Sequence, residues 1–207
     1  AAMSSMAMVF AIEAGMSTGK ATVFVGAGLT GAIFLQIPLG RLSDRFPRRI
    51  IILFCVFISA AIAGAQSLLS NSNDLHIFLN FLFGAFVFPL YGLFAALAND
   101  WIPSEKRISA SSTLVLASSS GAVVAPIVLG FLLGNFAPSS YFLANATVLT
   151  LIGVYISYRT RVREAVPVEK QSPFIPLVAR SGQIAHSLGR WIRNPLAVWP
   201  KEKSDQE

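Results

Sequence analysis

Residues 21–40, ATVFVGAGLTGAIFLQIPLG, are followed by the charged stretch 41–49, RLSDRFPRR, and then by a second apolar stretch, residues 50–66, IIILFCVFISAAIAGAQ. Each apolar stretch has the length of about 17 to 25 residues that an α-helix needs to cross the hydrocarbon core of a bilayer. The charged stretch between them is too short for a soluble domain. The pattern therefore predicts two antiparallel transmembrane helices joined by a short polar loop.

The composition extends this prediction to the rest of the chain. Of its 207 residues, 54% are hydrophobic and only 13% are charged, and the mean hydropathy is +0.64, whereas about 25% of an ordinary soluble domain is charged. We expect an all-α polytopic membrane helix bundle over residues 1–158, with five full transmembrane helices and one truncated N-terminal helix. The expected helices cover residues 1–12, 21–40, 50–66, 75–98, 109–134 and 140–158.

The first of these helices is too short to cross a membrane. Its 12 residues extend about 18 Å at a rise of about 1.5 Å per residue, against a hydrocarbon core of about 30 Å. We interpret it as the C-terminal part of a longer helix, and the chain as a fragment of a longer protein.

The basic residues fall almost entirely on one side of this topology. Fifteen of the sixteen Lys and Arg residues lie in the segment 41–49, between the fourth and fifth helices, or after residue 158, and Lys20 alone lies on the other side. Cytoplasmic flanks of membrane helices carry the excess of Lys and Arg. We therefore predict an integral membrane protein of a plasma membrane, either a cell membrane or a bacterial inner membrane. Its net charge of +6 is explained by topology and by contact with membrane lipids, so nucleic acid is not an expected partner.

Residues 159–207 form a basic tail that we place in the cytoplasm. Within residues 177–193 the apolar side chains fall near one helical face, and basic side chains lie elsewhere: Leu177, Ile184, Leu188, Trp191 and Ile192 against Arg180, His186, Arg190 and Arg193. This pattern predicts an amphipathic helix lying in the membrane interface. Gly182 and Gly189 each weaken such a helix by about 1 kcal/mol, so a disordered tail that folds on lipid is the alternative.

The charged loop carries a motif of defined spacing, in which Gly40 is followed by Asp44, Arg45, Arg48 and Arg49. It resembles the loop signature of the major facilitator superfamily (MFS), G-x-x-x-D-R-x-G-R-[RK], which follows the second helix of each six-helix half. Pro47 stands where the family has Gly, and proline cannot take the left-handed conformation that glycine permits. Such a degraded copy suggests the second, C-terminal half. The alternative is that the four arginines of the loop reflect the positive-inside bias alone.

We assign roles to four residues of this motif. Gly40 lets the helix end approach its neighbour, and Asp44 accepts hydrogen bonds at a helix N-terminus, where negative charge is favoured. Arg45 and Arg48 pair with an acidic residue at the end of the fourth helix, for which Asp100 is the first candidate and Glu105 the second. Such a cluster would hold the inner face of a transporter closed in one conformer and break in the other.

Small residues predict where the helices pack closely. Gly28 on the second helix and Gly121 and Ala125 on the fifth belong to series of small residues at four-residue spacing, which lets helix backbones approach in lipid. Pro126 and Gly130 complete a Gly/Pro pattern in the fifth helix that is similar to that of the fifth and eleventh helices of the family.

Candidate substrate-cavity residues are few, because no Asp, Glu, Lys, Arg or His lies in the middle of the five full helices. The remaining candidates are Glu13, Gln36, Asn80 and Tyr91. Pro89 is expected to kink the fourth helix between Asn80 and Tyr91. The alternative for the neutral side chains is an interhelical hydrogen bond. A coupling proton, where one is used, would bind at Glu13 or in the missing N-terminal half.

No motif of an enzyme, a metal site or a nucleotide-binding loop occurs in the sequence, so we predict no catalytic residues, no metal and no cofactor. The resemblance implies part of a secondary active transporter that moves an unidentified small molecule by alternating access, together with the missing N-terminal half. The alternatives are a six-helix channel or scaffold module, or a half-transporter that works as a homodimer.

Overall fold

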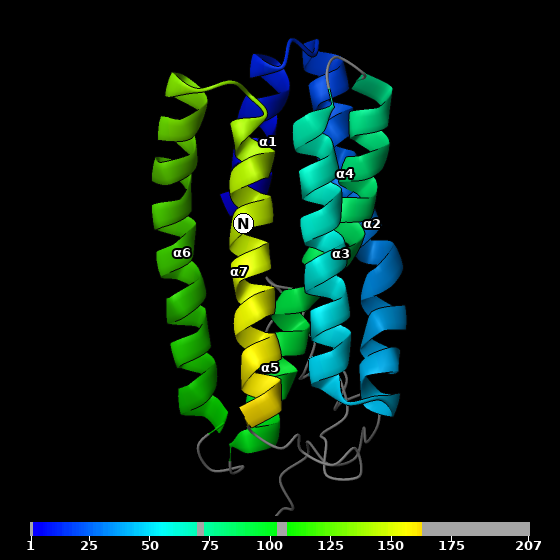
Figure 1. Ribbon diagram of the computed structural model, residues 1–207, viewed down its shortest axis with the longest axis vertical. Coiled ribbons are helices and arrows are strands. Elements are labelled where there is room, and N and C mark those ends of the chain that lie inside the picture. The colour runs from blue at the N-terminus through cyan, green and yellow to red at the C-terminus, as the bar shows by residue number, and fades with distance from the viewer. Residues whose placement is uncertain (1, 70–72, 103–106, 163–207) are drawn as a thin grey trace, which may run out of the picture. The chain divides into compact units, whose positions relative to one another are not determined.

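The computed structural model describes residues 2–69, 73–102 and 107–162, and the helices over these residues are all α-helices (Figure 1). They are α1 (Ala2–Glu13), α2 (Thr18–Arg45), α3 (Arg48–Leu68), α4 (Asn73–Val87), α5 (Pro89–Trp101), α6 (Arg107–Asn135) and α7 (Ser140–Val162). No strand occurs over this part of the chain. The predicted tail helix at residues 177–193 and Glu105 lie outside the described residues.

Over the residues that the structure describes, five helical segments are long and apolar enough to cross a membrane, which agrees with an all-α polytopic membrane bundle. One of these segments, Asp74–Trp101, consists of α4 and α5 together. The interruption at Phe88 has a local cause, because Pro89 has no N–H to continue the helical hydrogen bonds. The Phe88 N–H still donates to the Gly84 carbonyl at 3.2 Å, so the backbone passes the proline within a single span.

Helix α1 ends in a tight turn that sends the chain into α2. Gly15 has a φ of +79°, and the N–H groups of Gly15 and Met16 donate to the carbonyls of Ile12 and Ala11 at 2.9 Å each. These two bonds form a Schellman motif, in which glycine takes the left-handed conformation at low cost. Ser17 then caps α2 by accepting from the N–H of Lys20 at 3.4 Å.

The helices pack in a definite set of pairs. Helix α2 packs most extensively on α4, and α3 on α7, while α1 lies against α2 and α6. Figure 1 shows α1 beginning partway along its neighbours and running to the end of the bundle where α4 and α7 begin. The opposite end of the bundle holds the end of α2, the start of α3 and the end of α5.

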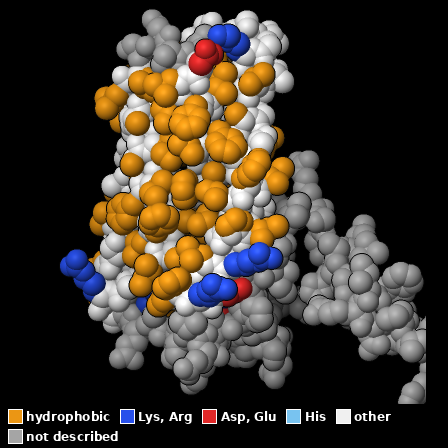
Figure 2. Space-filling view, turned by 90° about the vertical axis from the view of Figure 1, so that its right-hand side faces the viewer, with side chains coloured by type: hydrophobic (Ala, Val, Ile, Leu, Met, Phe, Trp, Pro, Cys, Tyr) orange, Lys and Arg blue, Asp and Glu red, His pale blue; other side chains and the backbone are white. Residues whose placement is uncertain are grey.

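The surface of these helices is strongly apolar. Large hydrophobic side chains remain exposed along α2, α6 and α7, for example Ile33 at 72%, Ile127 at 69% and Leu151 at 64%. Figure 2, seen from the side of α2 and α4, shows hydrophobic side chains covering this face between charged groups near its two ends. Exposed apolar patches of this extent mark contact with lipid or with other protein surfaces.

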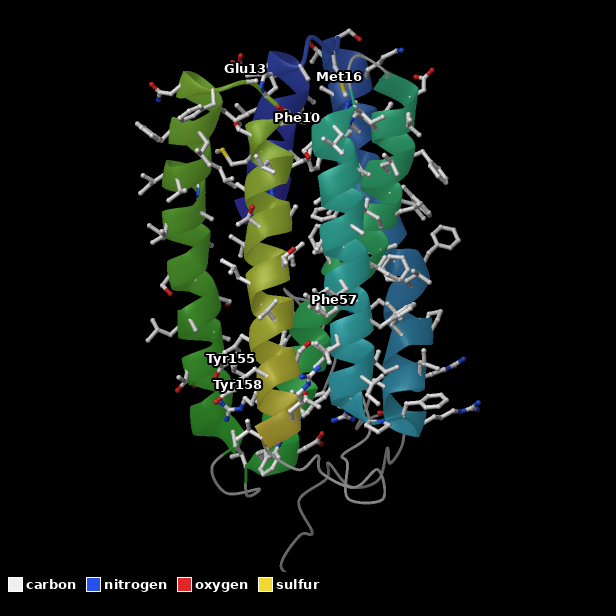
Figure 3. The ribbon with its side chains drawn as sticks, viewed as in Figure 1. Phe10, Glu13, Met16, Phe57, Tyr155 and Tyr158 are labelled. Carbon is white, nitrogen blue, oxygen red and sulfur yellow. The ribbon has the colours of Figure 1, made fainter. Side chains whose placement is uncertain are left out.

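Aromatic side chains fill the interior where α1 meets the other helices. The Phe10 ring, from α1, lies 4.7 Å from the ring of Phe142 and 5.4 Å from that of Tyr141, both on α7. It also lies 5.7 Å from the ring of Phe24 on α2. Figure 3 shows Phe10 close to the end of α1 at which Glu13 and Met16 are also labelled. Aromatic contacts therefore attach the short helix α1 to α2 and α7.

The tightest helix contact is the crossing of α2 and α4. A Cβ atom added to Gly84 would overlap the carbonyl oxygen of Gly28, and one added to Gly31 would overlap the carbonyl oxygen of Phe81. The two backbones therefore touch, which only glycine permits. Gly28 lies in the contact for which its spacing predicts it, whereas Gly84 was not among the predicted packing residues.

The small residues of α6 are placed differently from those of α2. A Cβ atom added to Gly121 or Gly130 would meet nothing within 4 Å, and Ala125 and Pro126 are only half-buried. The close packing expected at these positions is not formed among the described residues. Helix α6 presents this surface outward, since few of its described side chains are buried.

We expect Gly84→Ala to destabilise the protein by about 1–3 kcal/mol, because its methyl group would force the touching backbones of α2 and α4 apart. The midpoint of thermal unfolding in detergent micelles measures this. Gly64→Ala is the matched control, since its Cβ atom would enter open space on α3. Equal midpoints for the two variants would contradict the backbone contact.

Candidate functional site

The charged segment that separates the first two full spans is largely helical. Helix α2 continues through Asp44 to Arg45, and α3 begins at Arg48, so only Phe46 and Pro47 lie between them. The turn predicted for residues 41–49 is therefore shorter than expected. Its consequence is that Asp44 and Arg48 are held by regular helix ends, next to the end of α5, which carries Asp100.

Arg48 is the centre of the site. Its side chain is fully buried, and its Nη1 atom donates to Oδ1 and Oδ2 of Asp100 at 2.8 Å each. Its Nη2 atom donates to Oδ1 of Asp44 at 3.0 Å. The Asp100 side chain is 1% exposed and that of Asp44 is 35% exposed. We call Asp44, Arg48 and Asp100 the charge cluster.

The electrostatics of the charge cluster depend on its burial. Removing an isolated charge from water has a desolvation cost of many kcal/mol. Oppositely charged partners offset this cost only when their geometry is good. Arg48 meets the requirement because its guanidinium contacts two carboxylates from two other helices. The cluster thus connects the end of α2, the start of α3 and the end of α5 through one side chain.

The other residues of the motif lie in different surroundings. Asp44 lies in the last turn of α2, not at a helix N-terminus as expected, and bonds to the first residue of α3. Arg45 is exposed and forms no ion pair with a described residue. Gly40 is buried within α2. Of the two candidate acids, the structure brings Asp100 to Arg48.

Arg49 extends the site toward α5 through a contact that the sequence analysis missed. Its Cζ atom lies 5.5 Å from the centre of the Trp101 ring, and the Arg49 side chain is buried. An arginine over an indole ring is a favourable cation–π pair. The available sequence signal was a tryptophan next to Asp100, the acid predicted to face the arginines.

An ion pair at the opposite end of the described bundle provides a contrast. Lys20 Nζ lies 3.4 Å from Asp74 Oδ1, and their side chains are 50% and 90% exposed. Exposed pairs of this kind contribute about 0–1 kcal/mol. Charged contacts at the two ends of the helices are therefore of unequal strength.

The four predicted cavity residues occupy different environments. Glu13 is exposed at the end of α1, Tyr91 is exposed near the start of α5, and Gln36 is half-buried on α2. Asn80 is buried, and its Nδ2 atom donates to the Phe24 carbonyl at 2.7 Å. That bond joins α4 to α2, which is the interhelical alternative stated for these residues.

Asn80 also lines a small cavity between α1, α2, α4 and α7, bordered by Ala7, Gly28, Phe83 and Tyr141 among others. Its volume of about 20 Å³ has room for one water molecule. Among the described residues, no group of three or more His, Cys, Asp or Glu side chains is arranged to hold a metal ion.

Comparison with known proteins gives a consistent result. The family model of the Major Facilitator Superfamily matches residues 1–200. An uncharacterized MFS-type transporter of Enterobacter sp. (strain 638) is 28% identical over 126 residues, which are 61% of this chain and 31% of that protein. The uncharacterized MFS-type transporter YcaD of Escherichia coli O139:H28 (strain E24377A / ETEC) is 29% identical over 126 residues, which are likewise 61% of this chain and 31% of that protein. The match thus spans about a third of the length of these relatives, and no solved structure matches the chain.

We expect Asp100→Asn to lower the free energy of unfolding by about 3–5 kcal/mol, because it leaves the buried Arg48 charge with a much weaker partner. Asp74→Asn removes the carboxylate of an exposed ion pair and should change the free energy of unfolding by less than about 1 kcal/mol. Thermal unfolding of the two variants in the same micelles compares them. The double variant Arg48→Met, Asp100→Leu should recover part of the loss, and similar midpoints for Asp100→Asn and Asp74→Asn would contradict the role of burial.

Proposed function

The chain belongs to the Major Facilitator Superfamily, and from this membership we propose that it forms part of a secondary active transporter that moves a small solute by alternating access. It is an integral membrane protein, and five helical segments of its described residues are long and apolar enough to cross a membrane. We propose that the membrane is a plasma membrane, that the end carrying the charge cluster faces the cytoplasm, and that no enzymatic step is involved.

The observation that carries this proposal is the placement of Arg48 between Asp44 and Asp100. Three helix ends meet at one fully buried guanidinium, so they separate only if the ion pairs break. A device of this kind stabilises one conformer over another, because its contacts exist in one state and are lost in the other. Such a difference between states is what alternating access requires.

The cost of breaking the cluster has a suitable magnitude. Two conformers of a working protein commonly differ by a few kcal/mol, and loss of one partner of a buried pair costs about 3–5 kcal/mol. Arg48 can keep its charge solvated in the open state if water reaches this end of the helices. The cluster therefore supports a role as a closing contact of the cytoplasmic side.

The second half of the transporter is also part of the proposal. In such folds the substrate site lies near the middle of the membrane, between two related halves. The exposed apolar surfaces of α2 and α6, which include Ile33 and Ile127, support contact of this chain with an N-terminal half. The altered motif at Pro47 supports its assignment as the C-terminal half.

The substrate and any coupling ion are less constrained. Of the predicted cavity residues, Asn80 is used in the contact between α2 and α4, so its role there is structural. Tyr91, Gln36 and Glu13 remain as the proposed contacts for the substrate from this chain. Glu13 is the proposed proton-binding residue, unless the carboxylate lies in the other half.

We expect Arg48→Ala to reduce uptake by the full-length protein at least tenfold, because a shift of about 1.4 kcal/mol between two conformers changes their ratio tenfold. Asp44→Asn should reduce it less, since Asp44 is partly exposed, and Arg41→Ala, an exposed arginine of the same helix, should leave it near normal. Uptake of a panel of sugars, amino acids and drugs into vesicles at matched protein content measures this. Near-normal uptake for Arg48→Ala would mean that the charge cluster sets membrane topology and does not affect transport.

Passive, non-saturable flux in the same vesicles would indicate the channel alternative.

The orientation is tested by cysteine labelling in a Cys55→Ser background. We expect a cysteine at Arg45 to react with a membrane-impermeant maleimide only after the cells are permeabilised, because the basic ends of the spans face the cytoplasm. A cysteine at Gly19, exposed at the other end of α2, should react in intact cells. Both positions are accessible, unlike Ser43, which is fully buried. The reverse labelling pattern would overturn the assignment.

A further inference from the structure

A separate cavity lies beside the charge cluster, between α3, α5 and α7. Its volume is about 430 Å³, and its walls include Arg49, Phe94, Trp101, Tyr155, Ile156 and Arg159. This is within the range of about 300–1,000 Å³ of small-molecule sites. Figure 3 shows Tyr155 and Tyr158 on the C-terminal part of α7.

The charges of this cavity favour an anion. Two of its lining side chains are arginines and none is acidic, so two positive groups face one apolar space. The Arg159 Nη1 atom donates to the Tyr155 hydroxyl at 2.9 Å, which orients its guanidinium, and Arg159 forms no ion pair with a described residue. Arg49 is held by the face of Trp101 at 5.5 Å. Arginine binds phosphate groups with well-defined geometry.

The surroundings of the cavity favour a lipid as the source of that phosphate. Trp101, Tyr155 and Tyr158 lie near the ends of spans, and Trp and Tyr are enriched where membrane helices meet the headgroup layer. From the cavity toward the middle of α7, Leu151 and Val154 expose 64% and 57% of their surface, so acyl chains can follow the helix. Basic pockets between membrane helices bind anionic lipid headgroups in general.

We propose that this cavity binds the headgroup of an anionic phospholipid, with the phosphate at Arg159 and Arg49 and the acyl chains along α7. The lipid would bridge α5 and α7 at the end of the bundle where the charge cluster joins α2, α3 and α5. Binding does not depend on transport, so failure of this proposal leaves the proposed function unaffected, and the reverse also holds.

Trp101 provides a direct reporter, because the chain has three tryptophans and the other two, Trp191 and Trp199, can be replaced by phenylalanine. The full chain is reconstituted in phosphatidylcholine vesicles that contain acyl-brominated phosphatidylglycerol or, separately, acyl-brominated phosphatidylcholine. Quenching of Trp101 should show about a fivefold preference for phosphatidylglycerol, which corresponds to about 1 kcal/mol for one arginine near an anionic surface.

Arg159→Gln should reduce this preference to less than about twofold. Arg161→Gln should keep it, because Arg161 is exposed on the same helix and is not part of the cavity wall. Arg159 is itself exposed, so its replacement should leave folding intact, and an unchanged thermal midpoint checks this. Equal quenching by the two lipids in the parent protein, or a full preference in Arg159→Gln, would overturn the proposal.

Inorganic phosphate separates the two sources of the ligand chemistry. We expect inorganic phosphate at about 10 mM to leave the preference for phosphatidylglycerol in place, because the acyl chains add apolar contact that a free ion lacks. Loss of the preference would assign the cavity to free phosphate. That result would overturn the lipid assignment.

Discussion

A guanidinium buried in an apolar helix bundle imposes a strict condition on its surroundings, since the charge is tolerated only when carboxylates contact it. Arg48 satisfies this condition with Asp100 at 2.8 Å and Asp44 at 3.0 Å. Because the two acids belong to different helices, the positions of α2, α3 and α5 at this end depend on one another. The contact is directional and works only at short distance, so a modest separation of the helices removes most of it.

The contact of α2 with α4 follows a different physical rule. There Gly28, Gly31 and Gly84 allow the backbones to touch, and Asn80 adds a hydrogen bond to the Phe24 carbonyl. The crossing of α2 and α4 therefore depends on the packing of uncharged groups, whereas the end that carries the charge cluster depends on hydrogen-bonded ion pairs. In the proposed opening motion the ion pairs would break while the packed crossing stays in place.

Much of the fold could be predicted from hydropathy, because a helix that crosses a lipid bilayer needs a long apolar stretch. Charge and spacing made Asp100 the first candidate partner for the arginines. The sequence could not place Asp44, because nothing in residues 41–45 marks where α2 ends, and the helix continues to Arg45. Nor could it separate Gly28 from Gly121, since both lie in series of small residues but only Gly28 meets a neighbouring backbone.

Helix α6 shows why composition alone does not determine contacts in a membrane protein. In water, an exposed face rich in Val, Ile and Phe is unfavourable, but in lipid the hydrophobic effect does not distinguish a lipid contact from a helix contact. The exposed Ile127 and Phe131 are therefore compatible with either neighbour. The small residues beside them favour a helix as the neighbour. Gly121 and Gly130 leave open space that lets a second helix backbone approach closely, whereas flexible lipid chains do not need such space. The small residues on this surface of α6 agree with the contact to an N-terminal half that we propose for this chain.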